Sequence, residues 1–227
     1  MRRTNLRNLR SEIKHDMTFS IIAFDRKNKL IGSAVASKWT GVGGCTQYFR
    51  PGTGIVNIQN CAYAQVAYRI LDNMEAGLDL ESSLSGALLT DKACEKRQCI
   101  LADLRGNFFV HSGIKCTAPL FHRIGKNCAA AGNALASPSV IEAMIAAYES
   151  SPSSVMTEKL LEALEAGQAA GGDLRGQEAA AIKVYKTTYP VQRFYPIDLR
   201  VDSHDAPLDE LRRLYGVFGA RDRRVEF

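Results

Sequence analysis

Two apolar runs on either side of a short charged turn constrain the fold of this chain most strongly. Residues 18–25 contain four consecutive apolar side chains, Ile21 to Phe24, and a second strand-like run covers residues 30–38 after the turn Arg26–Lys29. This pattern predicts a β-hairpin. An unbroken apolar run is typical of a central strand that is covered on both faces. The chain therefore needs a sheet with other elements packed against both sides of it.

The rest of the chain groups its predicted strands and helices instead of alternating them. Residues 39–54 are rich in glycine and are predicted to be a loop. Antiparallel sheets with helices stacked outside them fit this order better than a doubly wound parallel sheet. We therefore expect an α+β fold. The further strands are expected at 55–59, 98–103, 108–112, 127–131, 179–185 and 197–201, and the helices at 63–74, 79–90, 137–148, 154–170 and after 205.

Length and charge narrow the class of protein. A chain of 227 residues suits one large domain. Residues 1–16 hold five basic and two acidic side chains, and so carry +3 of the total net charge of +5. We expect this extension to be flexible or not native, and residues 17–227 to form a single domain. The weakly charged remainder gives no reason to expect nucleic-acid binding.

Targeting and metal signals are not evident in the sequence. No apolar run approaches the roughly 18 residues that span a membrane, and residues 1–16 lack the apolar stretch of a secretory signal. We therefore expect a cytoplasmic protein with no membrane association. The six cysteines include no CxxC pair and only four histidines accompany them, so we expect reduced thiols, no metal and no cofactor.

The dipeptide Met17-Thr18 at the start of the first strand suggests a catalytic group. If Thr18 becomes the first residue of the mature chain, its hydroxyl is a nucleophile and its own α-amine can take the proton. An α-amine titrates near pH 7.7–8.0, close to the working pH of a general base. The alternative is that Met-Thr merely begins a strand.

The predicted hairpin also suggests neighbours for Thr18. Its centre lies between Lys27 and Asn28, which places Thr18 opposite Ser37, with Lys38 next in line. A lysine beside the Thr18 amine would lower the pKa of that amine by like-charge repulsion and could stabilise negative charge. The alternative is that Lys38 is a solvated strand end.

Three segments resemble domain-of-unknown-function family 1028. They are the run 18–23, the run 34–38, and the stretch 164–173 followed by Arg175-Gly176, whose Gly-Gln-Ala-Ala-Gly-Gly-Asp sequence is the specific part. The resemblance extends from Thr18 to Tyr215. It implies the fold of the N-terminal nucleophile (Ntn) hydrolases, a four-layer αββα sandwich. It implies little about the substrate.

The end of the specific stretch and smaller matches within this resemblance provide further candidate site residues. Asn133 or Gly132 could hold an oxyanion, and Asp173 could orient Arg175 or bind a substrate amine. Gln59 could contact the substrate. Each has a structural alternative: a turn asparagine at 133, a helix stop with an Asx turn at 173, and satisfaction of buried backbone groups by Gln59.

The leading hypothesis is hydrolysis of a small amide or peptide-like C–N bond, with Thr18 as nucleophile, Lys38 or Ser37 tuning its amine, and Asn133 or Gly132 holding the oxyanion. The expected partners are a small-molecule amide substrate and a second copy of the chain in a homodimer. A second hypothesis is a non-catalytic ligand-binding module with a blocked N-terminus. A third makes the basic extension an RNA or membrane contact.

Overall fold

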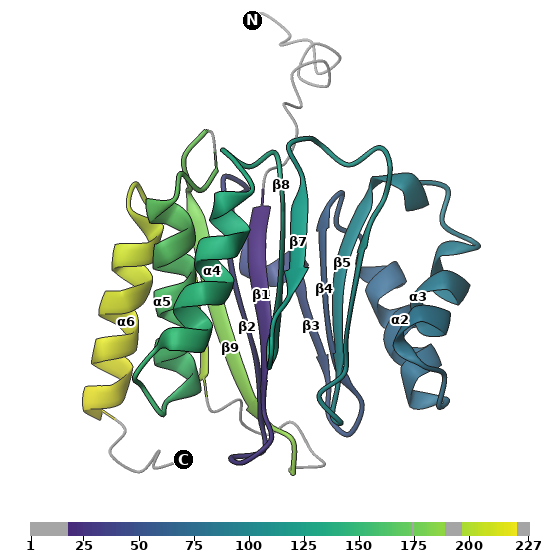
Figure 1. Cartoon of the computed structure of the whole chain (residues 1–227), viewed down its shortest axis with the longest axis horizontal. Coiled ribbons are helices and arrows are strands. Elements are labelled where there is room, and N and C mark those ends of the chain that lie inside the picture. The colour runs from purple at the N-terminus through teal and green to yellow at the C-terminus, as the bar shows by residue number, and fades with distance from the viewer. Residues whose placement is uncertain (1–17, 174, 189–196, 222–227) are drawn as a thin grey trace, which may run out of the picture.

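The computed structural model describes residues 18–173, 175–188 and 197–221. Within these residues the chain forms ten strands in two antiparallel sheets and six α-helices (Figure 1). This confirms the predicted α+β class. The predicted extension, residues 1–16, lies outside the described residues.

The larger sheet contains the predicted first hairpin at its centre. Its strand order is β10-β9-β2-β1-β8-β7, and every neighbouring pair is antiparallel. Strand β1 is therefore hydrogen-bonded on both edges, as its unbroken apolar run predicted. The strands are β1 (Thr18–Asp25), β2 (Leu30–Ser37), β7 (Phe121–Ile124), β8 (Cys128–Asn133), β9 (Ala179–Lys186) and β10 (Ile197–Val201).

The smaller sheet has the order β3-β4-β5-β6. Its strands are β3 (Gln47–Arg50), β4 (Gly54–Asn60), β5 (Arg97–Asp103) and β6 (Phe108–Ser112). The predicted hairpin of residues 98–112 is confirmed, with β5 beginning one residue earlier. The two sheets lie face to face in Figure 1.

The longer helices lie on the outer sides of the two sheets (Figure 1). Helices α4 (Ser139–Ser150), α5 (Met156–Ala169) and α6 (Pro207–Arg221) lie beside the larger sheet, and α2 (Ala64–Glu75) and α3 (Leu80–Leu88) beside the smaller one. Asp79, where the second helix was expected to begin, is the N-cap of α3, and its side chain accepts the Ser82 N–H.

Alternation along β1 separates two cores. Phe19, Ile21 and Ala23 pack in a cluster with α4 and α5. Ile22 and Phe24 belong instead to the layer between the sheets, which includes isoleucines from β4 and β5. Burying each such side chain stabilises the fold by roughly 1.5–3 kcal/mol. These inward residues occupy the end of β1 that leads into the hairpin turn.

Two regions differ from the sequence prediction. The expected loop at residues 39–54 contains the short helix α1 (Val42–Cys45) and strand β3. Strand β7 was not predicted at all. All four residues of β7 are exposed, so the sequence there has no apolar–polar alternation to mark a strand.

Candidate functional site

The inter-sheet layer changes from apolar to polar at the end where β1 begins. Six polar side chains from β1, β2, β4, β5 and β8 are buried there, with exposed fractions of 0–4%. We call them the inter-sheet polar cluster: Thr18, Ser20, Ser37, Gln59, Gln98 and Asn133. Burial of so many polar groups is tolerable only when they bond to one another.

Thr18 lies between two predicted partners at one end of the cluster. Its Cα is paired with Ser37 on β2, as the hairpin register predicted, and with Asn133 on β8. The hydroxyl oxygens of Thr18 and Ser37 are 3.0 Å apart. The Ser37 oxygen also accepts the Trp39 N–H at 3.0 Å. The Ser37 proton can therefore be donated to the Thr18 oxygen.

Three amide side chains and Ser20 form the rest of the cluster. Gln98 Oε1 accepts from Gln59 Nε2 at 2.8 Å and from Asn133 Nδ2 at 3.0 Å. Ser20 donates to Gln59 Oε1 at 2.7 Å, which ties this chain back to β1. The sequence prediction included Gln59 and Asn133 but missed Gln98. The available signal was its place in the 98–103 strand, in phase with the inward-facing Ile100.

Asn133 carries an unusual acceptor. Its Oδ1 atom is buried and has no hydrogen-bond partner among the described residues. Leaving such an atom unpaired costs roughly 1–3 kcal/mol. The other two side-chain atoms in this condition, Gln47 Oε1 and Asn57 Nδ2, are an acceptor and a donor on paired residues of β3 and β4. Within the part of the chain that the structure describes, no unpaired donor of this kind lies opposite Asn133 Oδ1.

A pocket of about 140 Å³ opens beside Thr18. It lies between the start of β1, the segment from Trp39 through α1, and the end of β4. All of its lining residues are uncharged: Thr18, Trp39, Val42, Cys45, Thr46, Gln59, Asn60 and Ala62. Two members of the inter-sheet polar cluster, Thr18 and Gln59, therefore line this pocket.

Lys38 follows Ser37, but its ammonium is paired with a carboxylate. Nζ lies 3.3 Å from Glu178 Oε2, and the lysine side chain is 42% exposed. Hydrogen bonds from Thr40 and Lys38 lower the pKa of Glu178. The structure therefore brings Ser37 and Asn133 to Thr18, and directs the charge of Lys38 to Glu178.

Asp173 and Arg175 form a local turn near the end of β2. The buried Asp173 carboxylate accepts the Arg175 N–H at 2.7 Å and the Lys38 N–H at 3.2 Å. Gly132 lies within β8, where an added Cβ would come 2.6 Å from Leu135 Cδ2. Packing therefore accounts for the glycine. Asp173 closes its own turn and also pairs with the Arg175 guanidinium, whose Nη2 lies 3.4 Å from Oδ2.

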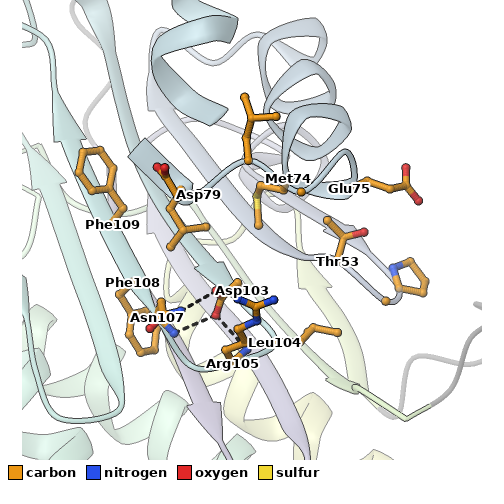
Figure 2. A pocket seen from close by; sticks show the side chains of 15 residues that line it. Thr53, Met74, Glu75, Asp79, Asp103, Leu104, Arg105, Asn107, Phe108 and Phe109 are labelled. Carbon is orange, nitrogen blue, oxygen red and sulfur yellow. Dashed lines mark hydrogen bonds between the residues drawn. The ribbon is translucent and has the colours of Figure 1, made fainter. Parts of the chain in front are cut away.

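A larger pocket of about 550 Å³ lies beside the turns that join β3 to β4 and β5 to β6 (Figure 2). Its lining residues include none of the predicted site residues. The Asp103 carboxylate at this pocket accepts the N–H groups of Arg105 and Asn107, both at 2.9 Å, and the Asn107 side chain at 2.7 Å. These hydrogen bonds of the Asp103 carboxylate stabilise the turn between β5 and β6.

Comparison with known proteins places the chain in a family. The model of a family of unknown function, DUF1028, matches residues 18–211. The chain belongs to this family. The crystal structure of protein SPO2555 from Silicibacter pomeroyi, attributed to the same family, is similar with a TM-score of 0.80 and 27% identity, over 89% of this chain and 86% of that one.

Other comparisons add little. Anbu (ancestral beta-subunit) from Yersinia bercovieri is similar with 10% identity and a TM-score of 0.41, over 92% of this chain and 97% of that one, a likeness too low to bear on the fold. None of the curated proteins matches the chain significantly. Among the described residues, no helix combines the length and apolar character needed to cross a membrane.

Proposed function

We propose that this chain is an amide hydrolase of the N-terminal nucleophile type, acting in a form that begins at Thr18. The observation that carries the proposal is the buried Thr18 hydroxyl, 3.0 Å from the Ser37 hydroxyl and lining a pocket. The fold we assign to it is the four-layer αββα sandwich of that class. Supporting this, helices flank the paired sheets on both outer sides (Figure 1), and the family match begins at Thr18.

The chemical step uses two groups of one residue. Thr18 Oγ1 attacks the substrate carbonyl while its proton passes to the α-amine of Thr18. Ser37 donates its own proton to Thr18 Oγ1, which leaves the Thr18 proton directed to the amine. The protonated amine then delivers its proton to the leaving nitrogen as the C–N bond breaks. Water hydrolyses the resulting ester and regenerates Thr18.

Asn133 supplies the groups that position this chemistry. Its Oδ1, which has no partner among the described residues, accepts a hydrogen bond from the free α-amine, because a primary amine offers more protons than a peptide N–H. Gln98 Oε1 uses one of the two amide protons of Asn133. The other is the donor we propose for the oxyanion. Lys38 has a secondary role, since its ammonium is already paired with Glu178.

Covalent labelling tests the nucleophile without knowledge of the substrate. Attack on a β-lactone opens the ring and adds the whole lactone to the protein, with no leaving group. In the chain beginning at Thr18, we expect one lactone per chain in the intact mass, and peptide mapping should place it on Thr18. Thr18→Ala should abolish the labelling. Thr157→Ala, at a buried threonine on α5 that does not line the pocket, is the matched control and should keep it.

The full-length chain is the second control. There the Thr18 nitrogen is an amide without basic character, so labelling should be far slower. If the chain beginning at Thr18 is folded by circular dichroism but is not labelled at Thr18, the nucleophile is refuted. That result would favour the non-catalytic ligand-binding module instead.

A further inference from the structure

The pocket beside Thr18 has a defined size and chemical character. We propose that it receives the acyl part of the substrate and selects an uncharged group about as large as a benzene ring, with the amine part remaining outside. This inference rests on the proposed function, because it assumes that Thr18 attacks the carbonyl at the pocket. It adds a substrate class to that function.

Volume sets the upper limit on the acyl group. The pocket measures about 140 Å³, and an apolar protein cavity of about 150 Å³ holds one benzene molecule. A phenyl or short branched alkyl group therefore fills it, whereas an acetyl methyl leaves most of it empty. A long unbranched chain has to extend past the pocket into solvent.

Charge excludes a second group of substrates. All eight lining residues are neutral. Three cations near lining residues are already paired with a carboxylate, at 2.7–3.3 Å: Lys38 with Glu178, Arg97 with Asp91 and Arg200 with Asp202. A fourth, Lys96, whose carbonyl accepts from Asn60, has an exposed side chain. An acyl group with its own carboxylate would lose its hydration without gaining a counter-ion, which is strongly unfavourable.

The walls indicate which part of the substrate lies inside. Val42 and Thr46 are 1–2% exposed and form the deep part of the pocket. Trp39 is 50% exposed and Ala62 is also exposed, so these two form the rim. Thr18 lines the same pocket, so the acyl group of the ester formed on its hydroxyl oxygen extends into the pocket. The amine, which leaves first, faces solvent beyond Trp39.

A series of 4-nitrophenyl esters tests this selection on the chain beginning at Thr18. Phenylacetate, acetate, monoglutarate and decanoate share one leaving group, and each rate is divided by that ester's own alkaline hydrolysis rate. The rate with Thr18→Ala is subtracted. We expect phenylacetate to exceed the other three in kcat/KM by at least about tenfold, as a well-filled apolar pocket gives.

A substitution at the rim links the preference to the pocket. Ala62→Leu adds three carbon atoms at an exposed lining position and should lower the phenylacetate-to-acetate ratio about tenfold. Ala146→Leu makes the same change on the exposed outer surface of α4 and should leave the ratio unchanged.

The outcomes separate this inference from the proposed function. Thr18-dependent hydrolysis that prefers glutarate or decanoate overturns the inference and leaves Thr18 as nucleophile. A phenylacetate preference that Ala62→Leu does not change also overturns it, because the acyl group then lies elsewhere. Hydrolysis of no ester in a Thr18-dependent manner, together with no lactone labelling, overturns both.

Discussion

Replacement of Gln98 by methionine should lower the free energy of unfolding more than a substitution at an exposed residue does. Gln98 is fully buried and makes four hydrogen bonds: it accepts from Gln59 and Asn133, and donates to Ser112 Oγ at 3.0 Å and to the Gly132 carbonyl at 3.1 Å. Methionine has nearly the same length and fills the space, so the substitution removes the bonds with little change in packing.

The magnitude follows from what each partner has left. Gln59 Nε2 keeps its bond to the Ala131 carbonyl at 3.1 Å. Asn133 loses the bond of its nitrogen while its oxygen already has no partner among the described residues. An unpaired buried amide costs roughly 1–3 kcal/mol, and each ordinary lost bond about 1. We expect the free energy of unfolding to fall by about 3 kcal/mol, and the Tm by roughly 6–12 °C.

Equilibrium unfolding in urea, followed by circular dichroism, measures this change. Gln168→Met is the matched control, because Gln168 is exposed on α5, and its effect should stay within about 0.5 kcal/mol. A loss below about 1 kcal/mol for Gln98→Met, with an unchanged urea dependence, would show that the amides re-pair or that the cluster contributes little. Either result would remove the basis for a positioned Asn133.

Two further predictions concern stability. Arg97 lowers the pKa of Asp91 through hydrogen bonds, and both side chains are at most 6% exposed. The stabilisation therefore exists above the unfolded pKa, about 4, and is lost as the pH falls below it. Asp91→Asn should lower the free energy of unfolding by about 3 kcal/mol at pH 7. Urea titrations should show that this difference between the variant and the native chain shrinks below pH 4. A difference that stays constant with pH would contradict the pairing. Gly132→Ala places a Cβ against the Leu135 side chain and should cost roughly 1–3 kcal/mol, whereas Gly216→Ala in open space on α6 should be neutral or stabilising in the same assay.

The sequence predicted the central part of the fold because local and tertiary signals agree there. The run 18–25 is apolar without a break, and the structure pairs it on both edges. Its register with Ser37 follows from the length of the turn alone. Strand β7 escaped prediction because its pairing with β8 comes from the sheet and not from its own exposed residues.

The candidate site was predictable only in part, for a similar reason. Ser37 lies opposite Thr18 by hairpin geometry, which is local. Asn133 reaches Thr18 through the pairing of β8 with β1, and the sequence suggested it only through the family resemblance. Gln98 enters from the other sheet: its phase with Ile100 indicates that it faces inward, but no spacing within the chain places it beside Thr18. The direction of the Lys38 side chain depends on Glu178, which is 140 positions further along the chain.

The two ends of the inter-sheet layer differ in composition: one is apolar and stabilises the fold, and the other is polar. At the hairpin end, Ile22, Phe24, Ile55 and Ile100 bury apolar surface and hold the sheets together. This contribution does not depend on the polar end. An Asn133 acceptor without a partner among the described residues can therefore persist at a cost of roughly 1–3 kcal/mol. Proteins usually keep an unsatisfied buried polar atom only where that atom binds a further group during function. Under the proposed function, that group is a free amine on Thr18, the residue opposite Asn133 on the neighbouring strand.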